Sequence, residues 1–346
     1  NKKEDDTAGL FNGNISETLW RTSADNTKRK YAYNYDNINR LLEANYGKED
    51  LNTLDNYLEK LSYDKAGNIL TIERNGNLDP SGGAPVNQID KLEYSYHPQN
   101  KNLLLKVNDI SGSPQGFNQA NDVANGDVDA NNVDHTEDYT YDFNGNMKTD
   151  TNKGIESITY NHLNLPINIV FSGTNNGNIL YIYNAIGGKV KKVVEDNVAH
   201  ITTTTDYLSG FQYLNTTLQF FPHAEGYVHY TRPLSNSQLG SFNYVFNYTD
   251  HLGNVRVSFA NDPLQGNVLK ILEENHYYAF GLKHKNYNVE HLDFDNFPDT
   301  GVELVPMPAV ANASYNYKYN GKELENELGK NTYAYGWRDY DPAIGR

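Results

Sequence analysis

The chain has 346 residues, of which 44 are acidic and 29 basic, so its formal net charge is −15. This charge repels phosphate backbones and anionic membrane surfaces, which argues against nucleic-acid binding. The chain has no cysteine, which rules out disulfides and thiolate metal sites, and no apolar run approaches the roughly eighteen residues that a membrane span needs, so we expect no membrane insertion.

The 28 tyrosines and the aromatic content of 12% favour strands, because aromatic rings pack well on a pleated, half-buried surface. Glycine and proline are scattered through the chain, usually beside Asn or Asp, as many short strands joined by tight turns require. The chain starts at Asn1 without a hydrophobic signal core and stops at Arg346. We therefore expect an internal piece of a longer protein.

In chain order, one motif recurs: Tyr, then Asp or Asn, a short spacer, Gly or Asn, and a β-prone run. The clearest copies are residues 33–41, Tyr63-Asp64-Lys65-Ala66-Gly67-Asn68-Ile69-Leu70, and residues 141–147; weaker copies begin at Tyr160, Tyr183 and Tyr248. In each copy the Asp or Asn caps the turn and Gly or Asn takes a positive φ. Each copy therefore predicts a β-hairpin, and successive hairpins must pair into a long sheet.

Three stretches interrupt this rhythm. Leucines at helical spacing over residues 49–61 predict one short amphipathic helix that ends where a strand begins at Leu61. Residues 111–135 are rich in Gly, Asn and Asp without periodicity, which predicts a long, exposed and mobile loop. Residues 282–312 carry a cluster of prolines, which predicts a connecting excursion between hairpins.

The Tyr-Asp motif with its Gly-Asn turn resembles the YD repeat of RHS-type proteins. Four segments near the C-terminus resemble, in order, the RHS repeat-associated core domain in the variety typical of Bacteroidota. These are residues 248–257, residues 273–282, Tyr319-Asn320-Gly321-Lys322-Glu323-Leu324, and Tyr335-Gly336-Trp337-Arg338-Asp339-Tyr340-Asp341-Pro342-Ala343-Ile344-Gly345-Arg346. The resemblance covers the chain as YD repeats over residues 1–240 and a core domain over residues 241–346.

The resemblance implies an all-β ribbon of consecutive hairpins that spirals into a cocoon around a C-terminal cargo polypeptide, often a toxin. Its partners would be the rest of the same protein, this cargo and a component of a secretion system. It also implies export or a place at the cell surface. We expect a structural shell fragment rather than an enzyme that turns over a separate substrate.

A second function implied by the family is self-cleavage after the core domain by carboxylates of the aspartyl-protease type. Asp341 matches the Asp of the family's first Asp-Pro motif, and Arg338 matches the Arg that precedes it. A second Asp-Pro motif is expected after Arg346, so the segment as given holds an incomplete catalytic site. Two close carboxylates are needed to share a proton, and Asp341 otherwise reads as a turn cap before Pro342.

Metal and ligand sites have weaker support. Asp127, Asp129 and Asn131 imitate a calcium loop, but Asn132 stands where the loop needs Gly and Asp138 where it needs Glu, which favours a solvated acidic loop. The ten histidines are dispersed, and we expect no cofactor.

The tyrosines leave a third function open. Their faces could stack on sugars, as in a surface adhesin or other carbohydrate-binding protein. Because they recur at the same place in each hairpin, we instead expect cross-strand ladders that hold the sheet together.

Overall fold

The computed structural model describes residues 9–21, 26–48, 55–76, 87–119, 137–235, 240–266, 268–285, 291–307 and 315–346. In these ranges the chain forms strands and three single-turn 3₁₀ helices, with no α-helix. The all-β prediction is therefore confirmed. None of the helices in these ranges is long and apolar enough to cross a membrane.

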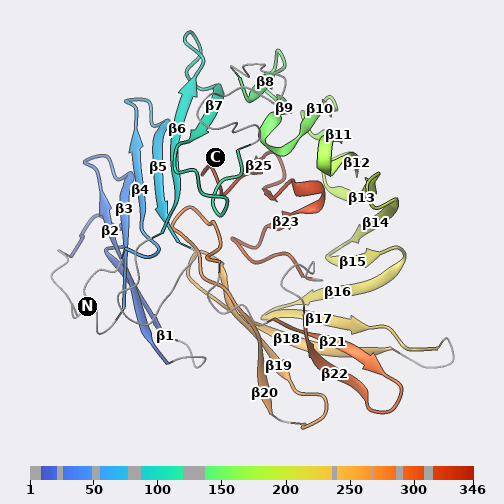
Figure 1. Ribbon diagram of the computed structural model, residues 1–346. Coiled ribbons are helices and arrows are strands. Elements are labelled where there is room, and N and C mark those ends of the chain that lie inside the picture. Colours follow the sequence, from blue (N-terminus) through green and yellow to red (C-terminus); the bar gives the residue numbers. More distant parts are fainter. Residues whose placement is uncertain are drawn as a thin grey trace. The chain divides into compact units, whose positions relative to one another are not determined.

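The first sheet has seven strands, each hydrogen-bonded to its neighbour in chain order (Figure 1). They are β1 (Glu17–Arg21), β2 (Lys28–Tyr35), β3 (Leu41–Lys48), β4 (Glu59–Tyr63), β5 (Ile69–Asn75), β6 (Gln88–Tyr96) and β7 (Leu104–Asp109). Every pair is antiparallel, so the sheet is a continuous meander.

The second sheet has thirteen strands, again in unbroken chain order. They are β8 (Tyr139–Tyr141), β9 (Met147–Asp150), β10 (Ile155–Tyr160), β11 (Pro166–Phe171), β12 (Gly177–Tyr183), β13 (Lys189–Asp196), β14 (Ile201–Leu208), β15 (Phe211–Leu214), β16 (Thr217–His223), β17 (Gly226–Thr231), β18 (Ser241–Thr249), β19 (Val255–Asn261) and β20 (Leu269–Glu274). The 3₁₀ helices η1 (Thr151–Lys153) and η2 (Gly173–Asn175) lie in its connections.

Five short strands follow in two small sheets. They are β21 (Leu292–Phe297) and β22 (Gly301–Pro306) in a hairpin, and β23 (Glu323–Glu325), β24 (Thr332–Ala334) and β25 (Asp339–Tyr340) in a three-stranded sheet, with η3 (Glu327–Gly329) between β23 and β24.

The repeated turns share one hydrogen-bond pattern. In the copy at Asp64, one carboxylate oxygen accepts from the backbone N–H of Ala66 at 2.8 Å and of Asn68 at 2.9 Å, and the Asp64 N–H donates to the Asn68 carbonyl at 2.9 Å. Gly67 takes φ +92°, where a side chain would strain the backbone. The same pattern recurs at the other five predicted copies, in which the capping residues are Asp36, Asp142, Asn161, Asn184 and Asp250. The six predicted hairpins are thus confirmed.

The repeat tyrosine links hairpins through its hydroxyl, while the expected ring ladder stays a prediction. In five hairpins the strand register shifts at this residue, and its hydroxyl donates to the first backbone carbonyl after the preceding turn. Tyr63 donates to the Leu41 carbonyl at 2.8 Å, and Tyr183 donates to the Pro166 carbonyl at 2.9 Å. The other three pairs are Tyr35 with Ile15, Tyr160 with Met147, and Tyr96 with Ile69. Tyr96 precedes the turn between β6 and β7 and is not one of the six predicted copies. Each of these five hairpins is therefore tied to the one before it.

The chain forms two compact units. Unit 1 consists of residues 1–139, 276–287 and 343–345, and unit 2 of residues 140–275, 288–342 and 346. The core of unit 1 gathers tyrosines and Ile89 on one face of the first sheet. Unit 2 has two cores on one face of the second sheet, one around Ile169 and Ile179 and one around Phe220 and Val245. We call these the buried faces, and the opposite ones the outer faces. The predicted motif boundary at residue 240 stays a prediction.

The interrupting stretches differ from expectation in part. The predicted helix over 49–61 is wrong from Asp55 onward, because residues 55–58 form a turn and β4 starts at Glu59; residues 49–54 lie outside the described residues. Residues 111–119 form no strand, as the loop prediction requires, but Phe117 is buried and its N–H donates to Asp90 at 2.5 Å, so this part is not exposed throughout. Residues 120–136 lie outside the described residues. The stretch 282–312 contains the hairpin β21–β22.

Candidate functional site

In each unit, segments from the C-terminal third of the chain pack against the buried face of the sheet. In unit 1, residues 276–285 lie against the tyrosine core. The His284 ring stacks on Tyr57 with centroids 4.0 Å apart and planes 8° apart, and its Nε2 lies 2.8 Å from the Tyr31 hydroxyl. Tyr278 donates to the Asn75 carbonyl at 2.5 Å. These contacts fix the segment on the buried face of the first sheet.

A buried charge cluster lies beside this segment. The Arg74 guanidinium contacts Glu59 at 2.7 Å and Asp90 at 3.2 Å, and all three side chains are fully buried. Burial disfavours the charged form of Arg74, but the two carboxylates outweigh burial and raise the pKa of Arg74 further. Arg74 also donates to the Ala343 carbonyl at 2.5 Å, and the Phe280 N–H donates to Glu59 at 3.2 Å. The cluster therefore binds two separate C-terminal segments by their backbones.

Residues 343–345 fit closely into unit 1. Tyr94 donates to the Ile344 carbonyl at 2.8 Å. Gly345 takes φ +67°, and a Cβ atom there would lie 3.2 Å from Phe280 and 3.3 Å from Ile69. Glycine suits this position, because the backbone conformation disfavours most side chains and a Cβ atom would crowd Phe280 and Ile69.

In unit 2 the strand β23 meets β12–β14 through a second buried charge cluster. It contains three lysines and four carboxylates: Lys189, Lys192, Lys330, Glu323, Glu325, Glu327 and Asp339. Lys189 lies 2.6 Å from Glu323 and 2.5 Å from Glu325, so one ammonium joins both carboxylates. Tyr207 donates to Glu323 at 2.7 Å and Tyr181 to Glu325 at 2.8 Å. The carboxylates of β23 thus have partners on several neighbouring strands.

Electrostatics favours the charged forms in this cluster. Burial alone would raise the pKa of Glu325, but Lys189, Lys330 and Lys192 outweigh burial and hold the pKa of that carboxyl well below its ordinary value. The pKa of Lys189 is raised well above its ordinary value because Glu325 and Glu323 outweigh burial there. The ion pairs therefore persist across the physiological pH range.

The hairpin β21–β22 and residues 315–317 cover the rest of the buried face of unit 2. Tyr315 stacks on Tyr227 with centroids 4.0 Å apart and planes 5° apart. Phe294 stacks on His229 at 5.3 Å, and His229 Nε2 lies 3.6 Å from Asp293. Burial lowers the pKa of His229, and Asp293 opposes this shift only in part.

Asp341 and Arg338, the predicted catalytic pair, are not brought together by their side chains. Asp341 is buried, and its carboxylate lies 2.7 Å from Lys153 Nζ. Its backbone forms a tight loop with Arg346, with N···O distances of 2.6 and 3.1 Å. Arg338 is exposed. Residues 342–345 form a turn directly after Asp341, and both the turn-cap and the catalytic interpretations of this carboxylate stay predictions.

The predicted calcium ligands Asp127, Asp129 and Asn131 lie outside the described residues. Asp138 is described: it is buried, and its carboxylate accepts from the Val107 N–H at 2.9 Å. Its position in the loop pattern is thus explained by a structural hydrogen bond.

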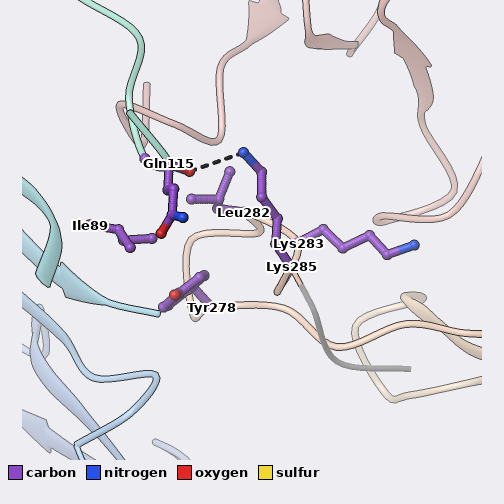
Figure 2. A pocket seen from close by; sticks show the side chains of 7 residues that line it. Ile89, Gln115, Tyr278, Leu282, Lys283 and Lys285 are labelled. Carbon is purple, nitrogen blue, oxygen red and sulfur yellow. Dashed lines mark hydrogen bonds between the residues drawn. The ribbon is translucent and has the colours of Figure 1, made fainter. Parts of the chain in front are cut away.

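Figure 2 shows a small cavity in unit 1 where Lys285 Nζ reaches the Gln115 carbonyl at 3.0 Å. Tyr278, Leu282 and Ile89 also line it. Its volume of about 20 Å³ suits one water molecule and is far below the several hundred Å³ of a ligand pocket.

Sequence reasoning missed both charge clusters. A signal for Arg74 was present, because it follows Ile72 at the alternate position of a strand and therefore faces the core. Nothing in the local sequence identifies its distant partners.

No family model matches the chain, and no curated protein matches it. Among solved structures, it is similar to the crystal structure of TcdB2-TccC3-TEV, with a TM-score of 0.39 and 16% identity over 95% of this chain and 18% of that one. It is also similar to TcdB2-TccC3 without its hypervariable C-terminal region, with a TM-score of 0.36 and 14% identity over the same shares. The chain spans less than a fifth of those proteins.

Proposed function

We propose that this chain is part of the wall of an RHS-type shell whose sheets are held closed by its own core-domain segments. Two things support the proposal: the six YD hairpins, and the order of the four core-like segments. The observation that carries it is the fastening of residues 276–285, 343–345 and 323–325 to the buried sheet faces by two charge clusters.

This fastening suits a wall more than a substrate site. Removing one member of a buried charge cluster leaves the other charges buried without partners, which is costly. This cost holds the segments in one arrangement. In the proposal, the enclosed cargo is a polypeptide that follows the core domain, and the protein is exported or displayed at the cell surface.

The test uses the native full-length protein that contains this chain. Limited proteolysis followed by peptide mass spectrometry would compare cleavage after Arg346 with cleavage of the same region in denaturant. The proposal expects downstream peptides to resist protease until the wall unfolds. Downstream peptides that are cut at the same rate before and after denaturation would refute enclosure.

Self-cleavage is a second candidate, and the burial of Asp341, which matches the family's first Asp-Pro motif, favours it. A functional Asp341 predicts that Asp341→Asn in the full-length protein leaves the downstream region covalently attached. Lys153→Met serves as the comparison, since it removes the ion pair and keeps the carboxylate. Cleavage at an unchanged rate in Asp341→Asn would eliminate this function.

A further inference from the structure

Six aromatic side chains gather on the outer face of unit 2, across strands β16–β19, which Figure 1 shows side by side in yellow and orange. They are Phe221, Tyr230, Phe242, Tyr244, Phe246 and Phe259, and we call them the outer aromatic patch. Their neighbours along each strand, such as Phe220, Tyr227 and Val245, face the buried core instead. The patch is therefore the opposite side of the same strands.

Ring contacts join the patch in two groups, and the His223 ring connects Tyr244 to the second group: it lies 5.7 Å from Tyr244 and 5.3 Å from Phe246 between ring centroids. Phe242 lies 5.3 Å from Tyr230 and 6.1 Å from Phe221 between ring centroids. Phe246 stacks on Phe259 at 5.7 Å. Phe242 is 55% exposed and Tyr244 is 60% exposed, so the contacts within the patch leave much of it open to solvent. Exposed apolar surface of this kind marks an interaction site.

The patch is uncharged across the sheet. Phe221 and Tyr244 both lie opposite Val228, and Tyr230 lies opposite Phe242. Phe246 lies opposite Gly226 and Phe259, and Phe259 lies opposite Ile271. No charged side chain thus faces any of the six in the paired registers. On a chain with a net charge of −15, this neutrality is a local exception.

We propose that the outer aromatic patch binds the same patch of a second copy of this chain. Two acidic chains repel each other, so they can approach closely only where no charge must be buried. An interface core rich in Tyr and Phe and poor in charge has this composition. Two sheet faces also pack well at a spacing of about 10 Å, as in β-sandwiches. This inference is independent of the proposed shell function.

Sedimentation velocity of the full chain across a wide concentration range tests the proposal. The expected result is a monomer–dimer equilibrium that Tyr244→Glu weakens about 10- to 100-fold, as loss of a central aromatic anchor does. The matched control is Phe143→Ser, which removes a fully exposed aromatic ring from a turn outside the patch and should leave the equilibrium unchanged.

A cysteine scan gives a second readout that survives if one variant misfolds. The chain has no cysteine, so Tyr244→Cys introduces a single thiol, which a bis-maleimide cross-linker with a reach of about 10 Å should join to the same thiol of a second copy. Lys60→Cys is the control, because Lys60 lies on the outer face of unit 1 and its side chain is 48% exposed. This variant should not form an intermolecular cross-link.

Three results would overturn the proposal. The first is a wild-type chain that stays monomeric at every concentration. The second is association that Tyr244→Glu does not weaken, as expected if the chains pair through an open strand edge. The third is equal cross-linking of the two cysteine variants. A monomer that binds neutral phosphatidylcholine vesicles through the patch would assign the surface to lipid instead.

Discussion

The outer faces of the two sheets differ although both sheets are built from the same hairpin. In unit 1, one row across four neighbouring strands reads Glu43, Lys60, Glu73 and Lys91, with charges that alternate from strand to strand. In unit 2, the corresponding side of β16–β19 carries the outer aromatic patch. The turn and the buried face specify the hairpin, so the residues of the outer face can vary without changing the fold.

The buried faces also differ, and this difference gives the largest expected effect. Arg74 is the single cation shown between Glu59 and Asp90, whereas three lysines share the carboxylates of the cluster in unit 2. Arg74→Met should therefore lower the free energy of unfolding of unit 1 by about 3–5 kcal/mol. Urea unfolding followed by Trp20 fluorescence, in a Trp337→Phe background, measures this.

Lys192→Met is the comparison in unit 2. Lys189 and Lys330 remain to pair Glu323 and Glu325, so the loss should be smaller, about 1–3 kcal/mol. Circular dichroism during urea unfolding would report it. A Lys192→Met variant that is destabilised more than Arg74→Met would contradict the idea that sharing makes the second cluster tolerant.

The tie between hairpins should be equal in the two units. Tyr63→Phe and Tyr183→Phe each remove one hydroxyl that donates to a backbone carbonyl and leave that carbonyl partly buried. Each should cost about 1 kcal/mol in thermal or urea unfolding. Burial raises the pKa of Tyr63 to about 12, so the hydroxyl remains a donor up to strongly alkaline pH.

Tyr244→Phe is the control for this pair. The Tyr244 hydroxyl has no partner among the described residues, so its removal should change the unfolding free energy by less than about 0.5 kcal/mol. An equal fall in the unfolding free energy of all three variants would mean that the hydrogen bonds from Tyr63 and Tyr183 to the backbone carbonyls do not stabilise the fold.

The turns should respond to acid in both units. Hydrogen bonds from the Asn68 side chain and from backbone N–H groups lower the pKa of the Asp64 carboxyl, although partial burial opposes this shift. At Asp142, burial would raise the pKa of the carboxyl, but similar hydrogen bonds outweigh burial and lower it. Because the folded pKa lies below the unfolded value of about 3.9, the stabilisation is complete above that value and is lost as the pH falls through the folded pKa.

The replacement of Asp64 and Asp142 by Asn should flatten the fall in stability between neutral pH and strongly acidic pH. The chain itself uses Asn161 and Asn184 at equivalent turns, so the fold tolerates the change. Asn161→Asp is the reverse control and should steepen the fall. An unchanged pH profile of urea unfolding in all variants would show that these turns do not contribute to acid sensitivity.

The smallest effect concerns the charged row of unit 1. Lys60 lies 2.9 Å from Glu43, with 48% of the Lys60 side chain exposed. Lys60→Ala should cost only a few tenths of a kcal/mol in urea unfolding, and the cost should shrink with added salt. A fall in the free energy of unfolding of more than about 1 kcal/mol would mean that the charged row contributes substantially to the stability of the sheet.

The hairpins could be predicted because their information is local. The segment from Tyr63 to Asn68 contains the donor, the cap and the glycine that the turn requires, and the same spacing returns in the other copies. The helix prediction failed for a local reason too. Glu59 and Leu61 face the core and Lys60 faces solvent, so the strand period of two wins over the leucine spacing.

The candidate site could not be predicted in the same way. Arg74 meets the Ala343 carbonyl across 269 positions of sequence, and no periodic signal connects them. Such contacts depend on which strand faces which segment, and the tertiary fold decides this. The motif resemblance indicated that residues 319–346 matter, but it drew attention to Asp341 and Arg338 rather than to Glu323 and Glu325.

The tyrosine tie has a direction, because the hydroxyl always belongs to the later hairpin and the carbonyl to the earlier one. During synthesis the carbonyl of Leu41 leaves the ribosome before Tyr63 does, so each new hairpin finds its acceptor already folded. The first sheet can therefore grow from its N-terminal end one hairpin at a time, as domains emerging in order do. A ribosome-bound nascent chain that is just long enough for the β4–β5 hairpin to have left the exit tunnel should already protect the Leu41 region from protease.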